Sequence, residues 1–140
     1  MADFDLGRFV EAQAQIWPTA LAELRAGRKQ SHWMWFVFPQ LAGLGSSPMA
    51  VHYAIRSADE ARAWLAHPLL GARLREGVAA MLAHPGRSAD ATLGGIDALK
   101  FRSSLTLFEA VAAEPALFAE ALDLFYHGAR DQRTLELLAG

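Results

Sequence analysis

Residues 33–38 read WMWFVF, six consecutive aromatic or aliphatic side chains that stop at Pro39. A block of this length is typical of a buried strand or of a short buried helix, and its periodicity does not distinguish the two. The rest of the chain has no stretch in which apolar and polar residues alternate over the length of a strand. A strand at residues 33–38 would therefore have no partner with which to form a sheet. We predict an all-α protein, a single compact domain over residues 1–140 with roughly seven short helices.

Prolines, glycines and capping side chains predict where these helices begin and end. The pair Trp17-Pro18 is expected to restart the chain, because the residue before a proline is pushed out of the α region. Serine or aspartate before an apolar periodic segment predicts a helix start. The expected helices and their boundaries are 4–14 after Asp3, 19–26 before Gly27, 48–55 after Ser47, 57–66 from Ser57, 69–83 before Pro85, 97–112 capped by Asp97, 115–127 before Gly128 and 131–140 capped by Asp131.

The composition excludes several classes of protein. The chain has 140 residues, of which 53% are hydrophobic, a net charge of −2 and no cysteine. Without cysteine there are no disulfides, zinc ribbons or thiol nucleophiles. Nucleic-acid binding requires a basic face that neutralises phosphates. The mildly acidic composition therefore argues against a nucleic-acid partner.

The N-terminal residues do not resemble a secretory signal. Asp3 and Asp5 stand where such a signal would be basic, and Arg8 and Glu11 interrupt the apolar residues. The apolar run at residues 33–38 is far shorter than the roughly 18 residues that span a bilayer. We therefore expect a cytoplasmic protein with no membrane-spanning helix and no membrane partner. The sequence does not indicate an oligomeric state.

The histidines show no metal-binding pattern. No two of them are four residues apart on one helix, as in zinc peptidases, and no cysteine supplements them. We expect neither a metal nor another cofactor. The five histidines are His32, His52, His67, His84 and His127.

The segment GLGSSP at residues 43–48 approaches the dinucleotide-binding fingerprint. Pro48 replaces the third glycine, which close helix-to-strand packing requires, and no alternation of strands and helices surrounds the segment. A turn that ends in a serine cap is the favoured interpretation. In a weaker alternative, the amides at the helix start and the hydroxyls of Ser46 and Ser47 hold an anion.

Residues 28–40 combine cationic side chains with aromatic rings. In proteins that bind nucleic acids, bases stack on such rings while the cations contact the phosphates. Core packing is the simpler interpretation of the aromatic side chains. His32 and Gln40 nevertheless bracket the block with polar groups that need partners when buried, which makes both candidates to line a pocket. The candidate ligand-binding residues of this segment are Lys29, His32, Trp33, Trp35 and Gln40.

Residues 97–108 form the second candidate segment. Helical spacing lets Asp97 pair with Lys100 and lets Lys100 reach a serine hydroxyl. A lysine with a pKa lowered by burial would activate such a serine as a nucleophile, but an exposed ion pair and serines bonded back to the helix explain the residues more simply. The candidates here are Lys100, Ser103, Ser104 and Thr106 for ligand binding, and Asp97, Lys100 and Ser103, together with His32, for catalysis.

Three functions are consistent with these segments. The leading hypothesis is a pocket between residues 30–40 and the helix at 97–108 that binds a small anionic molecule such as a nucleotide derivative. The alternative is a hydrolase or glycosidase-like enzyme, in which Asp97 or His32 transfers protons while Lys100 and Ser103 or Ser104 stabilise charge. The third is a protein-interaction module whose apolar surface docks a partner helix.

The chain also resembles the domain-of-unknown-function 1810 family of bacterial and fungal proteins, over essentially its whole length. The most specific match is SHWMWF at residues 31–36. The resemblance implies a compact all-α fold, hence a helix at residues 33–38, and no established activity. Some relatives carry a calpastatin label, but a compact domain differs from the disordered repeats of that inhibitor. The chain departs from the family at Ile16-Trp17 and Trp64, where an aromatic residue such as tyrosine is more usual, and these positions affect no candidate site residue. The other matching positions are Arg8, Phe9, Val10, Gln13, Lys29, residues 37–40, 43–45 and 53–55, Leu65, His67, Pro68, Asp97, Lys100, residues 102–108, Gly128, Asp131 and Thr134.

Overall fold

The computed structural model describes residues 4–140. This part of the chain forms nine helices and no strand, which confirms the all-α class with more helices than expected. The helices are α1 (Gly7–Ala26), α2 (Met34–Val37), α3 (Pro48–His52), α4 (Ala58–Ala66), α5 (Leu70–Leu82), α6 (Ala89–Leu93), α7 (Gly95–Val111), α8 (Ala116–Tyr126) and α9 (Gln132–Ala139).

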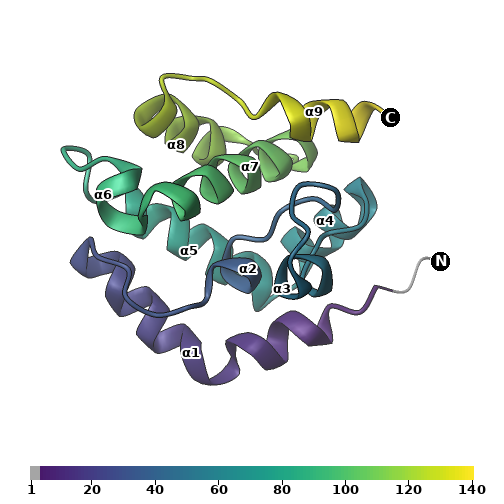
Figure 1. The fold of residues 1–140 in the computed structure, drawn as a ribbon, viewed down its shortest axis with the longest axis horizontal. Helices are drawn as coiled ribbons and strands as arrows, with labels where there is room; N and C mark the ends of the chain where they lie inside the picture. The colour runs from purple at the N-terminus through teal and green to yellow at the C-terminus, as the bar shows by residue number, and fades with distance from the viewer. Residues whose placement is uncertain (1–3) are drawn as a thin grey trace.

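Helix α5 lies in the middle of the molecule, with α1 below it and α7 and α8 above it in the view of Figure 1. It packs against α1, α4 and α8, while α7 packs against α4, α6, α8 and α9. These helices bury one continuous hydrophobic core. The largest side chains that are fully buried in it are Trp33, Trp64, Phe9, Phe38, Phe101, Phe108 and Phe118.

The apolar block at residues 33–38 is helical, as the family resemblance implied. Met34–Val37 form the short α2, and Phe38 follows it as the C-cap residue. The ring of Phe38 lies 4.7 Å from that of Phe101 and 3.1 Å from the position that a Cβ on Gly77 would occupy. Helix α2 is therefore anchored between α5 and α7, with Trp35 left half-buried at its outer side.

The prediction of two separate helices before Gly27 is wrong, because α1 continues through Pro18. Proline removes one hydrogen bond and bends a helix, and α1 is bent near its middle in Figure 1. The helix continues because one buried stripe runs across the proline at helical spacing, and tertiary packing outweighs the local preference. The stripe comprises Phe9, Gln13, Trp17, Ala20, Leu21 and Leu24. The predicted cap Asp3 lies outside the described residues.

Three predicted N-caps are confirmed. Ser47, Ser57 and Asp131 each accept a hydrogen bond from the backbone N–H three residues further on, at 3.0 to 3.2 Å. The short α6 was not predicted, and α3 ends earlier than expected. Ile55 leaves the helical path there and pairs with Leu41 in an isolated parallel bridge.

The assignment of Asp97 as an N-cap is wrong. Helix α7 begins at Gly95, its N-cap is Gly94, and no side chain caps it. Gly94 has a φ of +90°, a conformation that residues with a Cβ rarely adopt. Asp97 is instead the third residue of the helix, where its carboxylate still lies near the positive end of the helix dipole.

Among the helices of residues 4–140, none combines the length and the hydropathy that a membrane span requires.

Candidate functional site

Two lysines from distant parts of the chain converge on Asp97. The Nζ atom of Lys29 lies 2.9 Å from Oδ2 of Asp97, and the Nζ atom of Lys100 lies 3.5 Å from Oδ1. The backbone N–H of Lys29 also donates to the carbonyl of Thr92 at 2.7 Å. Asp97 therefore joins the loop after α1 to the first turns of α7. We call Lys29, Asp97 and Lys100 the lysine–aspartate cluster.

Each ammonium group of the cluster lies over a tryptophan ring. Lys29 Nζ is 5.1 Å from the ring centroid of Trp33, and Lys100 Nζ is 4.8 Å from that of Trp35. Such contacts contribute about 0.5 kcal/mol at exposed sites and about 2 kcal/mol when desolvated. The side chain of Lys29 is 8% exposed and that of Lys100 is 23% exposed. Lys29 is therefore fixed within the fold, whereas Lys100 is the more accessible cation.

Glu23 on α1 holds the loop that carries Lys29. Its Oε1 accepts hydrogen bonds from the backbone N–H groups of Gln30 and Ser31 and from Nε1 of Trp33, at 2.9 to 3.0 Å. Its Oε2 accepts from the hydroxyl of Ser31 at 2.6 Å. Burial raises the pKa of Glu23, but these hydrogen bonds outweigh it and bring the pKa from 4.5 down to about 2.

This carboxylate predicts a specific pH dependence of stability. A pKa that is lower in the folded state stabilises the protein above the unfolded value of 4.5, and the contribution is lost as the pH falls from 4.5 toward about 2. Glu23→Gln is therefore expected to destabilise the protein at pH 7 and to differ much less from the wild type at pH 3. Urea denaturation at the two pH values measures this.

The matched control is Glu11→Gln, which removes an exposed carboxylate from the same helix. We expect it to be neutral at both pH values. A loss of stability in Glu23→Gln that is equally large at pH 7 and at pH 3 would contradict the role assigned to the ionised carboxylate.

Two hollows adjoin the cluster, and Trp35 and Ile96 line both of them. The first has a volume of about 380 Å³ and the second of about 460 Å³, both within the range of small-molecule sites. We call the two together the groove. The first hollow is also lined by Lys29, His32, Met34, Leu93, Gly94, Gly95 and Asp97. The second is also lined by Gln40, Leu44, Gly45, Ser46, Ser47, Ala50, Leu99, Lys100, Ser103 and Asp131.

Most of the ligand-binding residues predicted from the sequence therefore line one groove. Lys29, His32 and Trp35 line the first hollow, and Trp35 lines the second with Gln40, Lys100 and Ser103. The side chains of His32 and Gln40 make no hydrogen bond to another described residue, so their polar atoms are available.

The other three predicted ligand-binding residues lie inside the protein. Trp33 is fully buried. Ser104 is 1% exposed, and its hydroxyl has no hydrogen-bond partner among the described residues. Thr106 donates to the carbonyl of Arg102 and accepts from the backbone N–H of Asp131. These three residues therefore do not line the groove.

The geometry does not form the Ser–Lys pair of the enzyme hypothesis. The hydroxyl of Ser103 donates to the carbonyl of Leu99 at 3.2 Å, and Lys100 pairs with Asp97 instead of a serine. A nucleophile needs a base within hydrogen-bond reach. No serine of residues 4–140 has a hydrogen bond to a lysine or histidine side chain. The part of the chain that the structure describes therefore offers no serine activated in this way.

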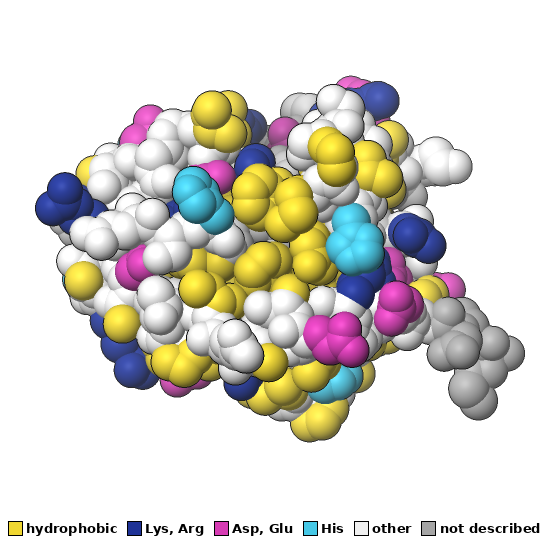
Figure 2. All heavy atoms as spheres, turned by 60° about the horizontal axis from the view of Figure 1, so that its bottom comes forward, with side chains coloured by type: hydrophobic (Ala, Val, Ile, Leu, Met, Phe, Trp, Pro, Cys, Tyr) yellow, Lys and Arg dark blue, Asp and Glu magenta, His cyan; other side chains and the backbone are white. Residues whose placement is uncertain are grey.

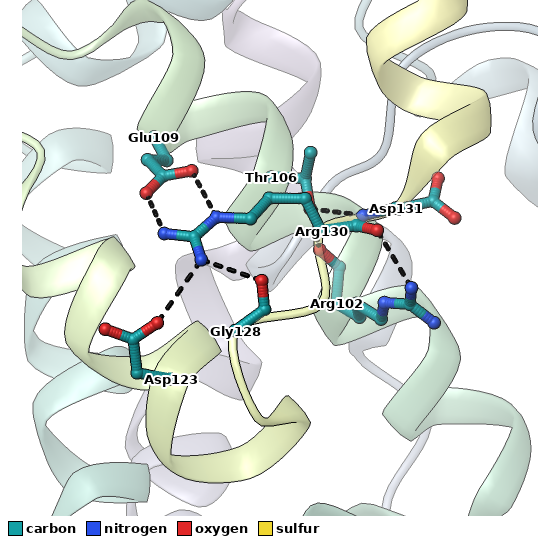
Figure 3. A network of polar contacts seen from close by, with 7 residues as sticks. All are labelled: Arg102, Thr106, Glu109, Asp123, Gly128, Arg130 and Asp131. Carbon is teal, nitrogen blue, oxygen red and sulfur yellow. Dashed lines mark hydrogen bonds and ion pairs between the residues drawn. The ribbon is translucent and has the colours of Figure 1, made fainter.

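Figure 3 shows the contacts that place Asp131 at the edge of the second hollow. Arg130 donates to both carboxylate oxygens of Glu109, at 2.9 and 2.5 Å. Arg102 donates to the backbone carbonyl of Arg130, and the N–H of Asp131 donates to Oγ1 of Thr106. These bonds fix the connection between α8 and α9 against α7, so the position of Asp131 is built into the fold.

The sequence model of a family described as protein of unknown function (DUF1810) matches residues 3–138. The chain belongs to the DUF1810 family. Among solved structures, it is similar to the conserved hypothetical protein Rv1873 from Mycobacterium tuberculosis, whose crystal structure was determined at 1.38 Å. The two chains are 51% identical, the match covers 98% of each, and the TM-score is 0.96. No curated protein matches the chain.

Sequence reasoning missed several groove residues of this DUF1810 protein. Asp131 was predicted only as a helix cap, and Gly94 and Gly95 were not among the candidate residues. Ile96 is apolar and 75% exposed, and because single exposed apolar residues are common on protein surfaces, it carried no signal of its own. The signal in the sequence was the glycine pair, because it leaves the first amides of α7 uncovered.

The described part of this DUF1810 chain contains no group of three or more histidine, aspartate or glutamate side chains that could hold a metal ion.

One face of the molecule carries an apolar surface. Figure 2 shows hydrophobic side chains gathered near the middle of one face, with histidine, basic and acidic side chains around them.

Proposed function

We propose that the groove binds a small molecule with an anionic group, such as a nucleotide derivative. One observation carries the proposal, the convergence of Lys29 and Lys100 on the single carboxylate of Asp97. Two ammonium groups beside one carboxylate leave one positive charge at the border of two hollows of small-molecule size. Charge-assisted hydrogen bonds from a lysine to a phosphate or carboxylate are roughly twice as strong as neutral ones.

The position of Asp97 limits how far its carboxylate offsets the positive charge of the two lysines. It lies in the first turn of α7, whose N-terminus carries about half an elementary positive charge. No side chain caps α7, and Gly95 and Ile96 line the first hollow. The helix end therefore adds to the attraction for an anion that the two lysines exert.

Lys100 is the residue through which the proposal is tested. It is more exposed than Lys29, and its contact with Asp97 is longer. Lys100→Gln is expected to weaken the binding of adenosine 5′-monophosphate about tenfold, the factor given by one charged hydrogen bond. Titration followed by NMR on the labelled protein measures the dissociation constant, and the shifted resonances are expected to include those of Trp35 and Ile96.

Arg62→Gln is the matched control, because it removes one positive charge from an exposed i,i+3 pair with Asp59 on α4. It should bind the nucleotide as the wild type does. Equal affinities of Lys100→Gln and the wild type, with unchanged melting temperatures, would overturn the proposal.

A further inference from the structure

The second hollow differs chemically from the first. We propose that it takes the hydroxyl-rich part of the ligand, so that the anionic molecule is a phosphorylated sugar with its phosphate at the border of the two hollows, beside the lysine–aspartate cluster. This inference rests on the proposed function and adds the chemical class of the ligand.

The second hollow offers hydrogen-bond donors and acceptors side by side. The hydroxyl of Ser103 donates to the carbonyl of Leu99, so it presents lone pairs. The hydroxyl of Ser47 accepts from the N–H of Ala50, so its own proton remains free to donate. The amide of Gln40 supplies both kinds of group. A sugar hydroxyl donates and accepts at once, and this mixture is what it requires.

Asp131 determines the charge of the group that fits here. Its Oδ2 accepts from the N–H and the hydroxyl of Thr134, and its Oδ1 has no hydrogen-bond partner among the described residues. An ionised carboxylate only accepts hydrogen bonds and repels a second anion. The part of the ligand in the hollow must therefore be neutral and must carry protons to donate.

The wall shared by the two hollows suits the remaining surface of a sugar. Trp35 and Ile96 line both hollows and present apolar side chains. The carbon-bound hydrogens of a sugar ring form an apolar face that packs against such side chains. A volume of about 460 Å³ accommodates the pentose part of such a ligand.

Ribose 5-phosphate, ribose and inorganic phosphate are the probes, each titrated into the full chain and followed by NMR. Ribose 5-phosphate is expected to bind about tenfold more tightly than inorganic phosphate, the gain that one or two net hydrogen bonds give. Ser46→Ala and Gln40→Leu are expected to reduce this ratio at least severalfold while leaving the binding of inorganic phosphate unchanged. Ser46 is exposed and Gln40 half-buried, so neither change disturbs the core.

Thr19→Ala is the matched control, because it removes an exposed hydroxyl from α1 that does not line the groove. It should keep the wild-type ratio. If inorganic phosphate and ribose 5-phosphate bind equally, or if both groove variants keep the ratio, the sugar inference is overturned while the proposed anion site stands. If none of the three probes binds, and adenosine 5′-monophosphate does not bind either, both proposals fall.

Discussion

Replacement of Gly71 by alanine is expected to lower the free energy of unfolding by about 3 kcal/mol, the upper end of the usual cost of overpacking. Gly71 lies in the first turn of α5. A Cβ at this position would lie 2.1 Å from the carbonyl oxygen of Leu65 and 2.9 Å from its carbonyl carbon. These are backbone atoms near the end of α4, and they cannot rotate away as the tip of a side chain does. Insertion of one methyl group therefore separates α4 from α5.

Urea denaturation of Gly71→Ala and Gly86→Ala tests this expectation. A Cβ on Gly86 would meet nothing within 4 Å, so its replacement is expected to change stability by less than about 0.5 kcal/mol. Similar stabilities of the two variants would show that the contact between Gly71 and Leu65 does not constrain the helix pair.

Replacement of Arg8 by methionine is expected to cost about 3–5 kcal/mol, the usual result of removing one partner from a buried ion pair. Nη1 of Arg8 lies 3.1 Å from Glu60, and the two side chains are 7% and 2% exposed. The same guanidinium donates to the carbonyls of His52 and Ala54 at 2.9 and 2.8 Å. Methionine fills a similar volume but leaves the carboxylate and these carbonyls without their donor.

The exposed pair between Arg62 and Asp59 provides the comparison, since such pairs contribute about 0–1 kcal/mol. Arg62→Met should therefore lose little stability. A second variant, Arg8→Met combined with Glu60→Gln, should recover part of the loss, because the unpaired charge is removed. If Arg8→Met unfolds at the same urea concentration as Arg62→Met, the buried pair does not stabilise the fold.

Most helix boundaries were predicted from short-range sequence signals such as capping residues. Ser47, Ser57 and Asp131 cap helices because a cap depends on only a few neighbouring residues. The predictions at Pro18 and Asp97 were wrong for different reasons, tertiary packing at Pro18 and a nearby glycine at Asp97. The buried stripe of α1 outweighs the proline, and Gly94 starts α7 before Asp97 is reached.

The sequence predicted which residues belong to the candidate site better than it predicted how they are arranged in space. Lys29 and Lys100 were both predicted as ligand-binding residues, yet no spacing rule brings residue 29 to residue 97. Trp33, Ser104 and Thr106 were proposed with their neighbours but lie inside the protein. Adjacent residues of a helix point in different directions, and the direction that faces solvent is set by tertiary packing.

The lysine–aspartate cluster joins two segments that have no fixed relation in the unfolded chain. A molecule that contacts both would bind the native state alone, and by mass action it would raise the free energy of unfolding by about 2.7 kcal/mol at about 100 times its Kd. The melting temperature of the protein in the presence of a library of metabolites is therefore an assay for the occupant of the groove. Such an assay requires no knowledge of any reaction.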